Sequence, residues 1–448
     1  MYQYRVRVPA DLRTKIGSTH INRSLKTACL TVATRSVRTV AYEIERFFEN
    51  ARAPIGSLET SIPHLRDQHA DRFQGSEGTK PTRALTFADV CHRYLNDPTR
   101  SRTDKSAVVY RATYAAFTAI FGSEIQAASI TREMCREALT VFQSLPSNAS
   151  KRWPNLTLQE VSAKARDEGI QPMSVANVNE YMNKLSTLFN WAVKEEIIAR
   201  NPSKGLRITD TVAPRDKRRP FSAAQLRRIF NAPLYRGCRD DGLGYATAGT
   251  ARPRRARYWI PLLALWTAMR QNEICQLHTA DVRKIEGILC IVVCAGEAID
   301  KHLKTAASER WVPIHPMLIR LGFPEYVGER RRNGDERLFP ELSLDTFGHY
   351  SSKFSKWFAR FLVRAGAEGE RTCFHSFRHC FRDALREAKV DREVALAIGG
   401  WTSSSGAGSG AVADAYGRGF SPQSLFDAIS KVDYPTLDLS HLHPNGRR

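Results

Sequence analysis

The stretch FHSFRHCFRDAL places His375 and Arg378 three residues apart, so that both lie on one face of an expected helix. Its phenylalanines predict that this helix is mostly buried. A histidine and an arginine on a buried face need an anionic partner, and a phosphate group suits both. For the neighbouring His379 we favour an ordinary histidine of the core.

A second candidate is Arg270, which follows the apolar run YWIPLLALWTAM. The large residues of that run recur at helical spacing and predict a buried helix: Trp259, Leu262, Leu263 and Trp266. An arginine between apolar elements is costly unless it is paired, and Glu273, three residues on, can orient it. Taken alone, such a pair is more often structural than functional.

Three further side chains, those of Lys304, Trp401 and Tyr416, become candidates only when they are considered together with the residues above. Lys304 precedes a small-residue turn in HLKTAASERWVPIH and, by itself, would be an exposed hairpin lysine. Residues 399–419 are Gly, Ser and Ala almost throughout, a composition typical of a flexible connection. This connection nevertheless holds Trp401 near its start and Tyr416 near its end.

All these residues fall within 221–435, which we expect to form one domain. Its runs ILCIVVC and ERWVPIH predict strands, and most of the rest predicts helices. The stretch SPQSLFDAISKV predicts an amphipathic helix that packs either on its own domain or on a neighbouring protomer. Residues 436–448 are expected to be a C-terminal tail.

Residues 85–205 predict a helical domain, flanked by linkers at 61–84 and 206–220. Its clearest helix lies in SVANVNEYMNKLSTLFNWAVKEEI, where Ser174 is a plausible N-cap and Lys184 and Lys194 are expected to point outward. The apolar stripe of that helix has three- and four-residue steps: Val175, Val178, Met182, Leu185, Phe189 and Val193.

The first 60 residues predict a small module of sheet and helix. YRVRVPADL and HINRSLKT alternate like paired strands, and SVRTVAYEIERFF has the pattern of a helix. Residues 1–40 hold eight Lys and Arg against one acid, Asp11. This density favours contact with a phosphate backbone over a solvated basic face.

The whole chain of 448 residues is strongly basic, with 67 Lys and Arg against 46 Asp and Glu, and a pI of about 9.8. This excess indicates a polyanionic partner, with nucleic acid ahead of an anionic membrane because no basic amphipathic helix or lipidation motif is evident. No apolar run approaches the roughly 18 residues of a membrane span. Nine scattered cysteines without a C-x-x-C pair favour reduced thiols in a cytosolic protein and give little support for zinc.

Five motifs follow one another in a fixed order over about 150 residues. TAMRQNEICQL is similar to the first arginine motif of the tyrosine recombinases, the phage integrase family, and KTAASERWVPIHP to their lysine hairpin. HSFRH resembles their His-x-x-Arg motif, and IGGWTS and YGRG stand where the family has its next motif and its nucleophile. Ala268 replaces the usual glycine, and Trp401 stands where histidine is commoner.

The resemblance implies a multidomain protein that is mainly α with small β-sheets. It implies a β+α N-terminal module that binds arm-type DNA, a helical core-binding domain and a mixed α/β catalytic domain. NKLSTLFNWAVKEEIIARNP resembles the last helix of such a core-binding domain.

The resemblance also implies a site-specific DNA recombinase that acts through a 3′-phosphotyrosyl intermediate, without metal, ATP or cofactor. Each candidate then has a role: Tyr416 as nucleophile, Arg270 and Arg378 as clamps on the phosphate, His375 as base or hydrogen-bond donor, Lys304 as acid, Trp401 as indole donor and Glu273 as support. The connection before Tyr416 would let it swing between docked and withdrawn positions.

The partners implied are double-stranded DNA, three further copies of the chain in a homotetramer on two DNA sites, and accessory DNA-bending proteins. The expected setting is the cytoplasm, at the nucleoid, during integration or excision of a mobile element. Two alternatives stay open: a topoisomerase-like strand transferase and a catalytically idle DNA-binding relative.

Overall fold

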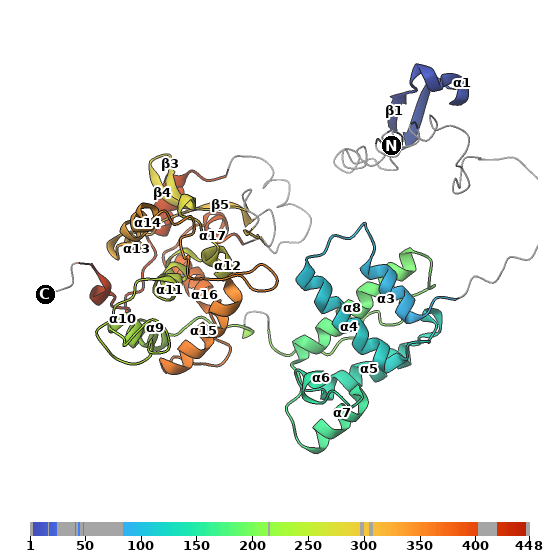
Figure 1. Cartoon of the computed structure of the whole chain (residues 1–448), viewed down its shortest axis with the longest axis horizontal. Helices are drawn as coiled ribbons and strands as arrows, with labels where there is room; N and C mark the ends of the chain where they lie inside the picture. The colour runs from blue at the N-terminus through green and yellow to red at the C-terminus, as the bar shows by residue number, and fades with distance from the viewer. Residues whose placement is uncertain are drawn as a thin grey trace, which may run out of the picture. The chain divides into compact units, whose positions relative to one another are not determined.

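The computed structural model describes residues 3–16, 18–24, 41, 44, 48, 84–213, 216–295, 300–303, 308–401 and 419–444. The chain divides into two compact units, Met1–Thr82 and Arg83–Arg448. Figure 1 colours them from blue to red along the chain. None of the described helices is long and apolar enough to cross a membrane. The fold is mainly helical with small antiparallel sheets, as the sequence predicted.

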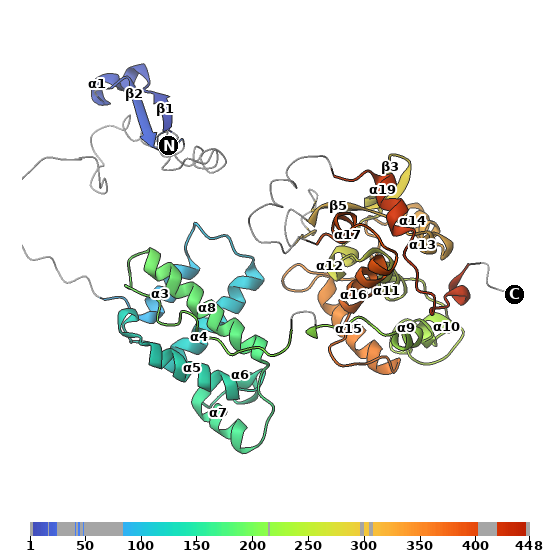
Figure 2. The same cartoon turned by 180° about the vertical axis from the view of Figure 1, so that it is seen from behind.

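The first unit contains the predicted pair of strands, which Figure 2 shows from behind. β1 (Gln3–Arg7) and β2 (His20–Ser24) are antiparallel, with Gln3 opposite Ser24. Between them lie the 3-10 helix η1 (Ala10–Leu12) and α1 (Arg13–Ile16). A small core joins this hairpin to residues farther along: Val8, Leu12, Ile44 and Phe48. Most of the helix predicted over residues 36–48 lies outside the described residues.

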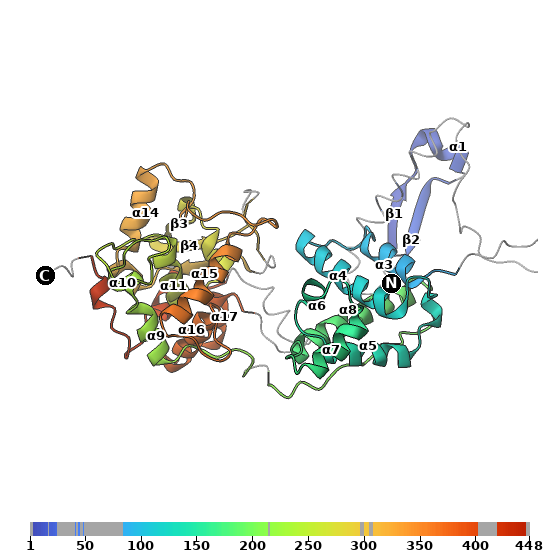
Figure 3. The same cartoon turned by 60° about the horizontal axis from the view of Figure 1, so that its bottom comes forward.

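The second unit begins with a set of helices around a core of their own (Figure 3). These are α3 (Phe87–Leu95), α4 (Asp104–Phe121), α5 (Arg132–Ser144), α6 (Ala149–Arg152), α7 (Leu158–Asp167) and α8 (Val175–Lys194), with the 3-10 helix η2 (Ala127–Ser129). All the α-helices of this set but α6 begin after a Ser or Thr whose hydroxyl accepts a backbone N–H three residues on. The sequence thus sets where these helices start.

The longest of them, α8, confirms the predicted Ser174 cap and most of the predicted stripe. Met182, Leu185 and Phe189 are fully buried, whereas Val175 at the first turn is exposed. The expectation for Lys184 was wrong. Its side chain is 8% exposed, its Nζ lies 2.5 Å from Glu180 Oε1, and the same Nζ is 5.7 Å from the centroid of the Tyr110 ring on α4.

The rest of the second unit packs around another core. Its helices are α9 (Ala223–Phe230), α10 (Pro233–Arg236), α11 (Ala256–Thr267), α12 (Gln271–Cys275), α13 (Pro316–Arg320), α14 (Phe323–Arg332), α15 (Ser351–Arg364), α16 (Ser376–Glu387), α17 (Arg392–Gly399) and α19 (Pro422–Ile429), with 3-10 helices η4 (Thr279–Asp281) and η6 (Ser440–Leu442). It also contains one antiparallel sheet, whose strands lie in the order β3 (Val282–Ile285), β4 (Ile288–Val293) and β5 (Arg310–Pro313). The last two are the predicted strands.

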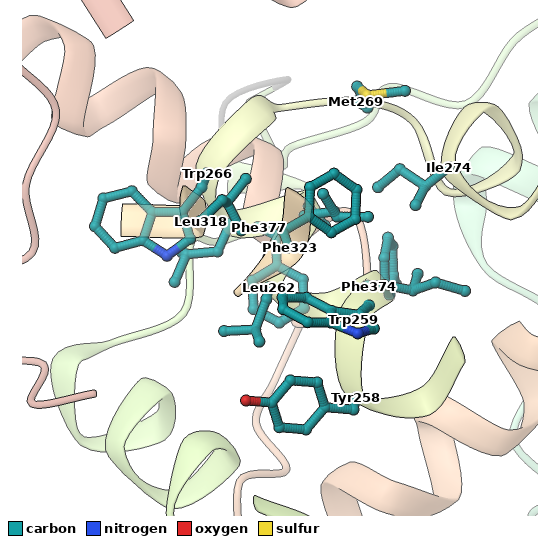
Figure 4. Packing of buried hydrophobic residues seen from close by; sticks show 14 of the residues in the cluster. Tyr258, Trp259, Leu262, Trp266, Met269, Ile274, Leu318, Phe323, Phe374 and Phe377 are labelled. Carbon is teal, nitrogen blue, oxygen red and sulfur yellow. The ribbon is translucent and has the colours of Figure 1, made fainter. Parts of the chain in front are cut away.

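The centre of this core is α11, the predicted helix with two tryptophans. Trp259 and Trp266 are at most 1% exposed, and Leu262 is fully buried between them (Figure 4). Trp259 meets Phe323 edge to face at 5.3 Å. Every residue of α11 except Arg257 is buried, and the helix contacts α12, α13 and α16. Arg270 follows three residues after Thr267, the last residue of α11.

Residues beyond 435, expected to be a tail, are part of this core. Leu437, Leu439 and Leu442 are buried, and Arg254 Nη2 donates to Leu442 O at 2.6 Å. The helix before them, α19, contacts α17, β4 and β5. Of the two alternatives for this helix, the structure contains the packing on its own domain.

We predict that Trp259→Ala lowers the free energy of unfolding by about 3–5 kcal/mol, because it leaves a cavity at the centre of the core. Urea unfolding followed by far-UV circular dichroism measures it. The matched control is Leu243→Ala, since Leu243 is 94% exposed and should change stability by less than about 0.5 kcal/mol. Equal effects of the two substitutions would contradict the packing described.

Candidate active site

Arg270 immediately precedes α12 and is held there by Glu273. The backbone N–H of Arg270 donates to Glu273 Oε2 at 2.8 Å, and its Nη1 donates to Oε1 at 2.6 Å. The same Nη1 lies 3.2 Å from Ser308 Oγ. The Arg270 side chain is 28% exposed and that of Glu273 only 4%. The carboxylate thus fixes a guanidinium that still reaches the surface.

A second arginine, Arg310 on β5, shares the same carboxylate. Its Nη2 lies 2.9 Å from Glu273 Oε2, and its side chain is 7% exposed. Burial alone would raise the pKa of Glu273, but the charge and hydrogen bonds of Arg310, with those of Arg270, outweigh it and lower that pKa. Glu273 therefore remains ionised between two guanidinium groups.

The C-terminal end of α17 brings three arginines together. Its last carbonyl oxygens accept one hydrogen bond each from a different guanidinium: Ile398 from Arg310 at 2.9 Å, Gly399 from Arg378 at 2.9 Å and Gly400 from Arg270 at 3.0 Å. Carbonyl groups at this end of a helix have no partner within the helix, and they carry partial negative charge. The arginines supply those partners.

Arg378 is the most deeply placed of the predicted clamp residues. It lies on α16 with 4% exposure, and its Nη1 also donates to Ala268 O. Its Nε is buried without a hydrogen-bond partner among the described residues. Burial lowers the pKa of Arg378 to about 9, with Glu273 opposing and Arg270 adding to the shift. It is still a cation at neutral pH, and its Nε–H has no partner among the described residues.

Ala268 has a conformation that accounts for the glycine usual at its position. It ends α11 with φ 53°, in the left-handed region that glycine adopts without strain. Alanine is the smallest residue with a Cβ, and the turn that exposes the Ala268 carbonyl to Arg378 is kept.

His375 directly precedes α16 and lies beside Arg378. Burial lowers its pKa to about 4, and the charges of Arg378 and Arg218 add to the shift. Its ring centroid is 5.4 Å from that of His379, nearly perpendicular to it. At neutral pH His375 is therefore an uncharged imidazole, able to accept a proton or to donate an N–H.

Trp401 follows the last turn of α17 and lies against two cations. Its ring centroid is 5.1 Å from Arg378 Cζ and 5.2 Å from Arg382 Cζ. A Cβ on Gly399 would lie 2.0 Å from the indole, so no side chain fits there. The ring thus covers the backbone to which the arginines bind.

The structure therefore brings together five of the seven residues singled out by sequence: Arg270, Glu273, His375, Arg378 and Trp401. Lys304, Tyr416 and the connection at 402–418 lie outside the described residues. Sequence reasoning missed Arg310. Strand alternation could have indicated it, because Arg310 shares a face of β5 with the buried Val312.

Residues 245–409 match the model of the phage integrase family. This part of the chain belongs to that family. The matched segment contains Arg270, Glu273, Arg310, His375 and Arg378, the residues of the cluster, as well as Trp401. Residues 1–53 match a separate model, a domain of unknown function named DUF6538. No curated protein matches the chain.

Solved integrases are similar to the chain at low identity. A lambda integrase dimer bound to a COC′ core site is 17% identical, with 71% of this chain and 93% of that chain covered and a TM-score of 0.48. A lambda integrase tetramer bound to a Holliday junction is 16% identical, with 90% and 94% covered and a TM-score of 0.47. The Tn1549 transposon integrase in complex with transposon right end DNA is 14% identical, with 71% and 92% covered and a TM-score of 0.48.

The lowered pKa of His375 predicts how stability depends on pH. The unfolded chain takes up this proton near pH 6.5 and the folded protein near pH 4, so the free energy of unfolding falls as the pH is lowered between these values. We expect His375→Gln to remove part of that fall, as measured by urea unfolding at pH 7 and pH 5. An unchanged difference between the two pH values in this variant would contradict the buried, neutral imidazole.

Proposed function

We propose that the protein is a site-specific DNA recombinase that cleaves and rejoins DNA strands through a covalent 3′-phosphotyrosyl intermediate. The observation that carries this proposal is the cluster at the end of α17. Two arginines, a neutral histidine and an indole converge there, within a phage integrase domain. Such a set of donors is suited to one phosphodiester group, whose charge and geometry match planar guanidinium groups.

Arg270 and Arg378 would bind the two non-bridging oxygens of the scissile phosphate. Positive charge there stabilises the additional negative charge that develops as the nucleophile attacks. Both guanidinium groups are already fixed by backbone carbonyls, so little rearrangement is needed when DNA binds. Trp401 would add its indole N–H and exclude water from one side.

Tyr416 would attack the phosphorus through its phenolic oxygen. The bond from phosphorus to the 5′ oxygen breaks, and a phosphorus–tyrosine bond forms in its place. A phenol with a pKa near 10 needs help at neutral pH. His375 would accept the phenolic proton or donate a hydrogen bond to the phosphate, and Lys304 would protonate the departing 5′ oxygen. The roles of Tyr416 as nucleophile and of Lys304 as acid rest on the sequence motifs in which these residues lie.

A 5′ hydroxyl from another strand would then attack the phosphotyrosyl bond and release Tyr416. Each exchange conserves one ester bond to phosphorus, so the reaction needs no ATP. We infer that four protomers act on two DNA sites, to integrate or excise a mobile element in the cytoplasm at the nucleoid, with accessory DNA-bending proteins as further partners. The net charge of +21 favours the duplex partner.

The decisive test is formation of the covalent intermediate. A pool of nicked duplexes with randomised sequence, incubated without metal or ATP, should yield DNA that stays attached to the protein after denaturation. We predict that Tyr416→Phe reduces this adduct by at least about 10⁴-fold, because the nucleophile is gone. Denaturing gels of radiolabelled duplexes measure it.

Tyr245→Phe is the matched control for that substitution. Tyr245 lies in the same domain and its ring packs on Trp357, so removal of its hydroxyl should leave the adduct unchanged. Adduct that persists in Tyr416→Phe would refute the assignment of the nucleophile. Absence of any adduct from the wild-type protein would refute the proposed function.

A further inference from the structure

Arg310 is a buried arginine to which the proposed reaction has so far assigned no part. It comes from β5, far in the chain from both Arg270 and α17. Its three nitrogens have three partners: Nη2 lies 2.9 Å from Glu273 Oε2, Nε 2.9 Å from Ile398 O and Nη1 2.9 Å from Ser308 O. One side chain thus ties together the start of α12, the end of α17 and the approach to β5.

The contact with Glu273 decides how much positive charge Arg270 presents. Glu273 is shared: its Oε1 accepts from the Arg270 guanidinium, and its Oε2 accepts from Arg310 Nη2 and from the Arg270 backbone N–H. Together, the side chains of Arg270, Glu273 and Arg310 carry a net charge of +1. Without Arg310 the remaining pair is neutral, and Oε2 loses its guanidinium partner while it still accepts the Arg270 backbone N–H. Buried charges interact strongly, so this change reaches the phosphate that Arg270 would bind.

The contact with Ile398 fixes the other end of the clamp. Gly399 and Gly400, the next two residues, supply the carbonyls that orient Arg378 and Arg270. A Cβ on Gly400 would lie 3.0 Å from Arg310 Nη1, so the arginine lies directly on this turn. Gly400 has φ 57°, in the left-handed region. Arg310 therefore holds in place the turn to which both clamp arginines bind.

We propose that Arg310 is a positioning residue of the active site, which acts through Glu273 and the end of α17 to keep the net charge around Arg270 positive and its guanidinium aimed at the scissile phosphate. The inference rests on the proposed function, because it assigns Arg310 a part in the same phosphate clamp. Arg310 itself need not touch DNA, since its side chain is 7% exposed and its nitrogens already have partners.

The alternative is that Arg310 only stabilises the fold. Both roles predict that Arg310→Met lowers the free energy of unfolding, so a stability measurement alone does not distinguish them. They differ in the rate of cleavage per folded molecule, which a positioning role predicts to fall and a purely structural role predicts to stay the same. They also differ in how the effect depends on the charge of the phosphate and on the presence of Glu273.

The test uses the full chain and a duplex selected by covalent capture, nicked near the scissile position. Single-turnover adduct formation is measured for Arg310→Met and Arg310→Lys, after correction for the folded fraction. We expect Arg310→Met to slow the step by about 10- to 100-fold, as loss of a residue that orients a catalytic group does. Arg310→Lys should recover part of the loss, since it restores the charge but not the three contacts.

The control is Arg254→Met. Arg254 is also a partly buried arginine of this domain, and it donates to two carbonyls, those of Leu321 and Leu442. We expect this variant to lose stability to a similar degree without a change in the rate of adduct formation per folded molecule. A similar slowing in both variants would overturn the proposal in favour of a general structural role.

Two further measurements identify the route of the effect. In a duplex with an uncharged methylphosphonate at the scissile position, less positive charge is needed, so the loss in Arg310→Met should shrink to less than about 3-fold. In a Glu273→Gln background the same substitution should cost less than it does in the wild type, because the route through the shared carboxylate is gone and only the contact with the end of α17 remains. Full losses in both settings would overturn the proposal.

The failure of this inference is distinguishable from failure of the proposed function. If the wild-type protein forms the Tyr416-dependent adduct while Arg310→Met matches the wild type per folded molecule, only the role of Arg310 is refuted. If the wild-type protein forms no adduct, the function itself is refuted.

Discussion

The candidate site depends on one contact, the meeting of three guanidinium groups with the C-terminal end of α17. Three cations in one place repel one another, and in a partly buried site that repulsion is strong. The helix end supplies three carbonyl oxygens with partial negative charge, and Glu273 supplies one full negative charge. These two features allow the cluster to form before any phosphate is present, which is what preorganised catalysis requires.

The elements around the cluster can be understood as supports for it. α11 is buried on all sides and ends in the left-handed turn at Ala268, which turns a carbonyl toward Arg378. α16 carries Arg378 on its buried face, and the sheet places Arg310 at the start of β5. Trp401 then covers the cluster with an apolar ring, whose centroid is 5.1 Å from Arg378 Cζ and 5.2 Å from Arg382 Cζ. The same hydrophobic core that stabilises the domain therefore also fixes the distances between its charges.

Local patterns in the sequence predicted much of this. Ser174 and the stripe of α8, the tryptophan helix α11 and strands β4 and β5 follow from capping and periodicity. The motifs also predicted that Arg270 would pair with Glu273. Features that depend on contacts between distant segments were missed. Lys184 is buried beside Tyr110 of α4, residues beyond 435 enter the core, and the three partners of Arg310 come together only in the folded domain.

The two glycines at the end of α17 have a consequence for local order. Gly399 leaves room for the indole, and Gly400 adopts a left-handed turn. Glycine loses more conformational entropy on ordering than any other residue, so this turn has little stability of its own. The hydrogen bonds from the arginines make up the difference. Order in the backbone of this turn and the placement of the three cations are therefore coupled through the same three hydrogen bonds.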